Sequence, residues 1–250
     1  MTISEKLSKI AENEEKVFDA GKKSQYDEFW DAFQENGTKK NYDYTFYGRG
    51  WNNTTFNPKY DIVPDRVMYA FAFLNKDAVG GRKEKKVDIA AALERNNVKL
   101  DFRLMEGGNG AGMFYQAGIS HLPELNTEKM ATFPNFFAHS EVEKIDKMTV
   151  NENAIFPGTF LRCYYLSGIT MAGCIGNDFD ISPSGILTKQ SIKSVVDTLS
   201  ATAEGKTVTL SKTAVNRAFH IDVDDEETYP EGSEYYKLRN SKPNWTFSYK

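Results

Sequence analysis

Three stretches of sequence that repeat one apolar pattern decide the fold of this chain. Residues 114–125 read FYQAGISHLPEL, residues 137–148 read FAHSEVEKIDKM, and residues 160–171 read FLRCYYLSGITM. Each stretch opens on a phenylalanine, and these phenylalanines are 23 positions apart. A short fixed period of apolar residues indicates supersecondary units that cannot bury their apolar faces alone. Neighbouring units are therefore expected to stack.

Two further columns of residues keep the same period. One contains Ile119, Val142 and Tyr165, and the other contains Leu125, Met148 and Met171. Between these columns, Leu122 and Ile145 are also 23 positions apart. The third copy has an apolar residue at the equivalent position only if its register shifts by one residue, to Ile169. Apolar side chains thus recur at every third position, and the polar residues between them are expected on the exposed side.

The repeats predict an α+β fold: an N-terminal amphipathic helix, then a short, irregular leucine-rich-repeat β-solenoid with a helical C-terminal cap. Four regions follow from this prediction. They are an N-terminal helix (1–37), an aromatic-rich cap with the first solenoid turns (38–110), the 23-residue leucine-rich repeats (111–174), and an enlarged terminal repeat with the C-terminal cap (175–250).

Local periodicity predicts the elements outside the repeats. Apolar residues three or four positions apart predict helices over 87–96, 188–199 and 213–219. Alternating or continuous apolar residues predict strands over 66–74, 98–104, 206–210 and 245–249.

The N-terminal helix is expected to carry two apolar faces. Thr2 and Glu5 form a capping-box pair, and Asn36–Gly37 is a helix stop signal. The aliphatic stripe is Ile3, Leu7, Ile10 and Val17, and the aromatic stripe is Tyr26, Phe29, Trp30 and Phe33. We expect the aromatic stripe to pack on the chain's own body and the aliphatic stripe to form a homo-oligomer. The alternative is a terminal helix that folds wholly onto its own domain.

Composition argues against several classes of protein. The net charge of −4 lacks the basic footprint of a nucleic-acid binder. Two cysteines, Cys163 and Cys174, are too few for a disulfide framework and are expected to be small buried residues. Residues 1–13 contain no apolar core of a secretory signal, and no apolar run approaches the ~20 residues that cross a bilayer.

Motifs for catalysis or cofactor binding are incomplete. The glycine-rich run 107–112 lacks the closing Gly-Lys-Ser/Thr of a phosphate-binding loop. The histidines His121, His139 and His220 form no H-x-x-x-H pair, and the acidic run 222–227 lacks the glycine and final glutamate of an EF-hand. We therefore predict no catalytic residue, no cofactor, no metal ligand and no enzymatic activity. The sequence does not decide whether two carboxylates form a pair for glycoside cleavage, because the distance between them depends on the three-dimensional structure.

A binding surface is expected where polar residues lie between the apolar columns and where aromatic residues cluster. The aromatic segment 41–60 is interpreted as a cap on the repeats, with a sugar-stacking platform as the alternative. The candidate binding residues are His121, Glu124, Glu143, Lys144, Lys147, Tyr47 and Trp51.

Two resemblances add a setting. Phe160 to Leu166, with Cys163 inside and Ile169 after it, resembles the bacterial BspA-like leucine-rich repeats. More widely, the chain resembles leucine-rich-repeat proteins of gut Firmicutes and their prophages, in segments 10–23, 26–31, 175–176 and 242–246. The resemblance implies a bacteriophage or prophage protein, in the virion or the bacterial cytoplasm, whose repeat sheet binds a partner.

Three functional hypotheses follow. The first is a non-enzymatic phage or prophage structural or host-recognition protein whose repeat surface binds a protein or surface glycan of a bacterial host. The second is an intracellular protein–protein interaction module that acts on a host bacterial protein. The third is an enzyme acting on surface polysaccharide.

The oligomerisation hypothesis is testable by light scattering on the full chain and on a version that starts at Asn36. We expect the full chain to be a dimer or trimer and the shortened chain a monomer, because the aliphatic stripe needs an apolar partner. If both versions are monomers, the aliphatic stripe packs on its own domain instead.

Overall fold

The computed structural model describes residues 42–43, 45–48, 56–74 and 86–250. The predicted N-terminal helix lies outside the described residues, and so do Trp51 and the proposed oligomerisation residues Ile3, Leu7, Ile10 and Val17.

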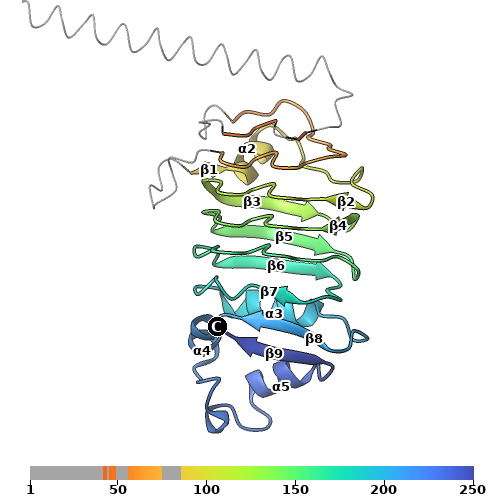
Figure 1. Cartoon of the computed structure of the whole chain (residues 1–250). Coiled ribbons are helices and arrows are strands. Elements are labelled where there is room, and N and C mark those ends of the chain that lie inside the picture. Colours follow the sequence, from red (N-terminus) through yellow and green to blue (C-terminus); the bar gives the residue numbers. More distant parts are fainter. Residues whose placement is uncertain (1–41, 44, 49–55, 75–85) are drawn as a thin grey trace, which may run out of the picture.

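The described part of the chain contains four α-helices and nine strands (Figure 1). The helices are α2 (Ile89–Arg95), α3 (Lys189–Thr198), α4 (Lys212–Phe219) and α5 (Glu234–Asn240), with a 3₁₀ turn at Glu226–Thr228. The strands are β1 (Val87–Asp88), β2 (Gly108–Asn109), β3 (Ile119–Asn126), β4 (Met130–Thr132), β5 (Lys144–Val150), β6 (Gly168–Gly173), β7 (Phe179–Asp180), β8 (Lys206–Leu210) and β9 (Trp245–Tyr249).

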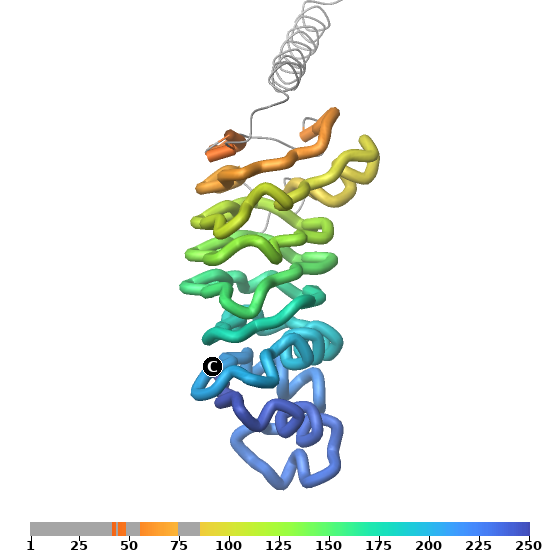
Figure 2. The backbone as a smooth tube through the Cα atoms, turned by 90° about the vertical axis from the view of Figure 1, so that its right-hand side faces the viewer, coloured from red at the N-terminus to blue at the C-terminus, as the bar shows by residue number. Residues whose placement is uncertain are grey.

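The predicted fold class is wrong: the described chain is α/β, not an α+β leucine-rich-repeat solenoid. Its strands pair in parallel in three separate sheets, ordered β1-β3-β5-β6, β2-β4 and β7-β8-β9. The tube view shows the chain between these strands as loops and helices of unequal length (Figure 2). The prediction took the strands as turns of one β-solenoid, whereas the strands divide among three sheets and α3 packs beside β6, the last strand of the four-stranded sheet.

The 23-residue period is confirmed by the strand register within the four-stranded sheet. Leu122 pairs with Ile145 and Leu125 with Met148, each 23 positions on. The third copy slips as the sequence indicated, because Ile145 pairs with Ile169. The slip also displaces the column predicted at Tyr165. Tyr165 is 39% exposed, and its neighbour Leu166 is fully buried instead.

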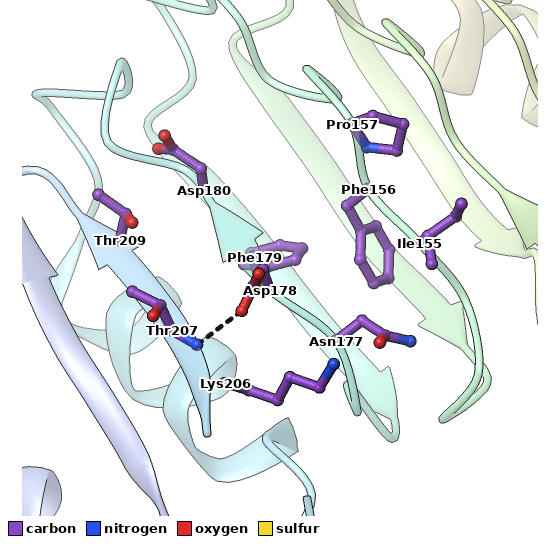
Figure 3. Close-up of a pocket in the computed structure, with 10 residues that line it drawn as sticks. All are labelled: Ile155, Phe156, Pro157, Asn177, Asp178, Phe179, Asp180, Lys206, Thr207 and Thr209. Atoms are coloured by element: carbon purple, nitrogen blue, oxygen red, sulfur yellow. Dashed lines mark hydrogen bonds between the residues drawn. The ribbon is translucent and has the colours of Figure 1, made fainter. Parts of the chain in front are cut away.

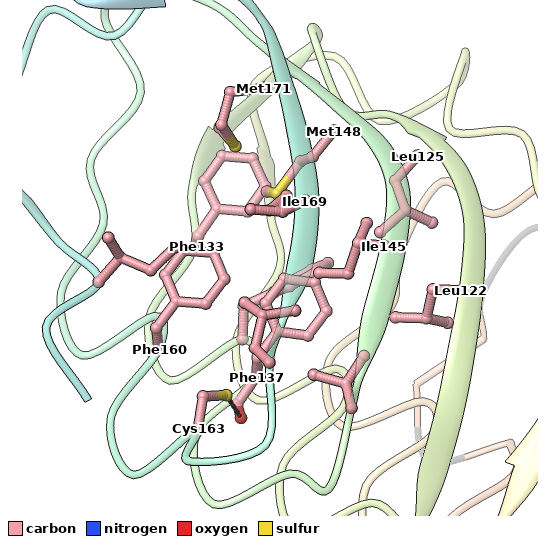
Figure 4. Packing of buried hydrophobic residues seen from close by; sticks show 14 of the residues in the cluster. Leu122, Leu125, Phe133, Phe137, Ile145, Met148, Phe160, Cys163, Ile169 and Met171 are labelled. Carbon is pink, nitrogen blue, oxygen red and sulfur yellow. Dashed lines mark hydrogen bonds between the residues drawn. The ribbon is translucent and has the colours of Figure 1, made fainter. Parts of the chain in front are cut away.

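A stack of phenylalanine rings holds the successive units together. Ring centroids are 5.3 Å apart between Phe71 and Phe114, 5.4 Å between Phe114 and Phe137, and 5.4 Å between Phe137 and Phe160. All four side chains are at most 1% exposed, so each ring loses nearly all its contact with water. Figure 4 shows Phe137 and Phe160 beside the aliphatic columns from β3, β5 and β6.

Stacked turns carry this ladder of rings from one unit to the next. The N–H of Phe71 donates to Met113, that of Phe114 to Phe136, and that of Phe137 to Thr159, at 2.8 to 2.9 Å. The turns repeat a left-handed backbone conformation at two positions four residues apart. Those positions are Tyr69 and Phe73, Gly112 and Gln116, Asn135 and His139, and Gly158 and Arg162.

Helix α3 covers the edge of the four-stranded sheet beside β6. Ser191 Oγ accepts the N–H of Ile169 at 3.0 Å, and Ser194 Oγ accepts the N–H of Met171 at 2.5 Å. Serine hydroxyls therefore take over the hydrogen bonds that a further strand would provide, and they close an edge that would otherwise be open to pairing with other chains.

Both cysteines are free thiols, and Cys163 is part of the core. Its Sγ donates to the carbonyl oxygen of Phe137 at 2.9 Å (Figure 4). Burial raises the pKa of the Cys163 thiol to about 12, so the group stays protonated at neutral pH. Cys174 is half-buried, so the expectation of two buried cysteines holds only for Cys163.

Local periodicity gave mixed results outside the repeats. The helices predicted over 87–96, 188–199 and 213–219 are confirmed as α2, α3 and α4, and the last two predicted strands are β8 and β9. The strands predicted over 66–74 and 98–104 are wrong. Residues 68–74 form turns, and Leu100 makes only an isolated bridge to Ile62. The apolar run over 66–74 is buried within these turns and includes the consecutive buried residues Ala70, Phe71 and Ala72, a burial pattern unlike that of a strand with one buried face.

Truncating one ring of the stack tests its role. We expect Phe137→Ala to lower the free energy of unfolding by about 3–5 kcal/mol, because a cavity replaces a ring that packs on both sides. The exposed control Leu161→Ala should change it by no more than about 0.5 kcal/mol. Urea denaturation measures the free energy of unfolding of both variants. Equal decreases in the two variants would show that the ring stack is not a main source of stability.

Candidate binding groove

A groove with a volume of about 920 Å³ lies beside the four-stranded sheet. Helix α2 and the segment after it form one wall, and β3 and β5 form the other. The first wall contributes Ala90, Ala91, Leu93, Glu94, Val98, Lys99, Leu100 and Asp101, and the second contributes His121, Pro123, Glu124, Asn126 and Asp146, with Asp88 between them. The volume lies within the range of ~300–1,000 Å³ that is typical of ligand sites.

Asp88 joins the two walls of the groove. It is the N-cap of α2, where its side chain accepts the N–H of Ala91 at 2.8 Å. The same carboxylate lies 3.5 Å from Nδ1 of His121 on β3. Asp88 therefore fixes the start of the helix and the orientation of the imidazole together.

His121 lies at the centre of a polar row that crosses the sheet. Its Nε2 is 2.8 Å from Oδ1 of Asp146, and Lys144 Nζ is 2.6 Å from the same oxygen. The row forms because the parallel register places Asp88 opposite His121 and His121 opposite Lys144. A second row pairs Glu124 with Lys147 at 2.6 Å.

Asp146 has the most perturbed environment in these rows. Burial raises the pKa of its carboxyl, but hydrogen bonds from Lys144 and His121 outweigh burial, and the pKa lies below its ordinary value. The carboxylate is therefore charged across the neutral range and holds its two partners in place.

The groove is acidic. Five carboxylates line it (Asp88, Glu94, Asp101, Glu124 and Asp146), against the one lysine Lys99 and His121. The wall on the α2 side is largely apolar, through Ala90, Ala91, Leu93, Val98 and Leu100. A ligand that offers both positive charge and apolar surface matches this lining.

The structure brings together four of the seven predicted binding residues: His121, Glu124, Lys144 and Lys147 form the two rows. Glu143 lies apart, where it pairs at 2.8 Å with Lys86, a buried lysine whose Nζ also approaches the Glu141 carboxylate at 3.3 Å. Tyr47 lies at the turns, with its ring 5.1 Å from that of Phe73. The partners of His121 are Asp88 and Asp146, neither of which is among the predicted binding residues.

Sequence reasoning missed Asp88 and Asp146. His121 and Asp146 are 25 positions apart, which is one repeat of 23 plus two residues along the neighbouring strand. The 23-residue period alone does not show that His121 and Asp146 are neighbours. That conclusion also requires that the strands be parallel and in register.

Comparison of the chain with models of protein families, with curated proteins and with solved structures gave no match. The resemblance to BspA-like repeats therefore stays a prediction. Within the described residues, no helix has the length and apolar character needed to cross a membrane, and no cluster of three or more potential ligands could hold a metal ion.

The depressed pKa of Asp146 predicts a pH-dependent contribution to stability. A carboxyl whose pKa is lowered on folding stabilises the native state above its unfolded pKa of about 3.9, and this stabilisation disappears as the pH falls through the lower folded pKa. Asp146→Asn should therefore lower the thermal unfolding midpoint at neutral pH and approach the wild type in strong acid.

The matched control is Glu204→Gln, which removes an exposed carboxylate that has no ion pair among the described residues. It should leave the midpoint nearly unchanged at every pH. If the unfolding midpoint of Asp146→Asn lies below that of the wild type by the same amount from neutral pH to acid, an electrostatic role for this carboxylate is contradicted.

Proposed function

We propose that this chain is a non-enzymatic recognition protein of a bacteriophage or prophage and that its groove binds a segment of a bacterial host protein. The observation that carries the proposal is the pairing of an apolar helix wall with an acidic strand wall in a groove of about 920 Å³. The phage setting, in the virion or in the bacterial cytoplasm, comes from the resemblance in sequence.

Preorganisation supports a binding role. The groove residues are held before any ligand arrives: Asp88 by α2, Asp146 by Lys144 and His121, and Glu124 by Lys147. A wall that is already ordered loses little conformational entropy on binding, so more of the interaction energy becomes affinity.

The charge of the groove selects the class of partner. Lys144 and Lys147 are paired with Asp146 and Glu124 within the sheet, and Asp101 lies 3.3 Å from Arg103, but the five carboxylates that line the groove still outnumber the lining cations Lys99 and His121. A segment containing lysine or arginine beside aliphatic residues would satisfy the carboxylates and cover Ala91 and Val98. The attraction should weaken as salt concentration rises, because exposed charges are screened.

A selection from displayed random peptides tests the proposal. We expect the wild-type protein to enrich peptides in which basic and apolar residues are adjacent. A synthetic copy of such a peptide should bind about tenfold more weakly to Ala91→Arg, which fills the exposed helix wall with bulk and positive charge. Fluorescence anisotropy at low and high salt measures the affinity.

The control is Gln190→Arg, which adds the same side chain at an exposed position of α3. It should bind the peptide as the wild type does. Selected peptides that lack basic residues, or that bind Ala91→Arg with unchanged affinity, would contradict the proposal. Retention of the wild-type protein, but not Ala91→Arg, on intact bacterial cells would favour host-surface recognition, and retention only by cytosolic proteins would favour an intracellular interaction module.

A further inference from the structure

A second hollow, of about 450 Å³, lies where two layers of the fold separate (Figure 3). Residues 155–157 form one side, and β7 with the start of β8 forms the other. Thr132 and Ile155 are joined by a parallel bridge, and β7 pairs with β8, but among the described residues no bridge joins 155–157 to β7. We call this hollow the wedge.

Asn177 joins the two layers at one end of the wedge. Its side-chain amide donates to the carbonyl oxygens of Asn153 at 3.2 Å and Ala154 at 3.1 Å. Asn151 makes equivalent contacts to Glu128 and Met130 one unit earlier, where the parallel bridge between Thr132 and Ile155 is also present. At the wedge, the Asn177 contacts hold one end, and the remainder is open.

The inner end of the wedge is closed by aromatic rings. Phe156 and Phe179 meet edge to face with centroids 5.1 Å apart, and both are buried. Ile155, which is 47% exposed, and the exposed Pro157 extend this apolar surface outward. A ligand in the wedge would meet aliphatic and aromatic carbon on this side.

The opposite side of the wedge carries polar groups that the protein does not satisfy. Within the described residues, Lys206 Nζ and the hydroxyls of Thr207 and Thr209 have no hydrogen-bond or ion-pair partner. Thr209 is 8% exposed as a whole, but it lines the wedge, so its hydroxyl can hydrogen-bond a ligand that displaces water from the hollow.

Two aspartates that line the wedge offset the positive charge of Lys206. Oδ1 of Asp178 accepts the N–H of Thr207 at 2.8 Å, which leaves Oδ2 without a partner among the described residues (Figure 3). Asp180 is engaged by Ser182 and by Lys250 at 2.8 Å. An anion near Lys206 would be repelled by these two aspartates, and a purely apolar ligand would leave the hydroxyls unsatisfied.

We propose that the wedge binds a neutral sugar unit of a glycan. A pyranose ring has an apolar C–H face, which suits the surface of Ile155, Pro157 and Phe156. Its hydroxyls both donate and accept, which suits Asp178, Lys206 and the two threonines. The wedge lies on the β7-β8-β9 sheet and shares no residue with the groove, so the two sites are independent.

Ligand-observed NMR provides the test. The probes are the methyl glycosides of glucose, galactose, mannose and N-acetylglucosamine, with glucuronic acid as an anionic comparison. We expect saturation transfer from the protein to at least one neutral glycoside. Thr209→Val keeps the shape of the side chain without the hydroxyl, and Lys206→Met keeps most of its length without the charge. Each should weaken binding roughly three- to tenfold, because each removes one hydrogen bond.

Thr170→Val is the matched control, because Thr170 is an exposed strand threonine on β6, outside the wedge. It should bind sugar as the wild type does, and so should the groove variant Ala91→Arg. The proposal is overturned if no neutral glycoside receives saturation at millimolar concentration, if glucuronic acid alone binds, or if both wedge variants, shown to be folded by their thermal midpoints, bind with unchanged affinity.

Discussion

The stacking of Phe71, Phe114, Phe137 and Phe160 is the constraint on which the remaining structure depends. Each ring buries both faces only if consecutive units keep the same height and rotation, and the centroid separations of 5.3 to 5.4 Å are only slightly longer than the ~4.8 Å between adjacent strands. The turns that carry the rings fix where each following strand begins. The register of the four-stranded sheet, and with it the row that contains His121, is therefore a consequence of aromatic packing.

Both hollows occur where this regular stacking changes. The groove lies where α2 packs beside β3, and the wedge lies where β7 pairs with β8 and does not continue the bridge at Ile155. Regular layers satisfy their own backbone groups and bury their own side chains, so they leave little for a ligand. Interruptions expose polar groups that are already fixed by rigid neighbours, and such positions are suited to binding.

The sequence predicted the elements whose signal is local. The columns Leu122/Ile145 and Leu125/Met148 are buried, Ile169 takes the slipped position, and α3 begins after its N-cap Thr188. It failed at 66–74, where an apolar run forms turns with left-handed residues at Tyr69 and Phe73, and in the fold class, because the strands divide among three sheets. For the site, it identified His121, Glu124, Lys144 and Lys147 as surface residues of the repeats, but it did not identify the partners of His121, which are Asp88 and Asp146.

The sequence by itself therefore determined the period of the repeats, the buried columns and the positions of α2, α3 and α4, since each depends on residues close together in the chain. Only the tertiary structure decided that the strands form three parallel sheets, that Asp88 and Asp146 meet at His121, and that Thr209 faces a wedge. These relations join residues 22 or more positions apart, and a period along the chain does not reveal which neighbours a fold will place across from each other.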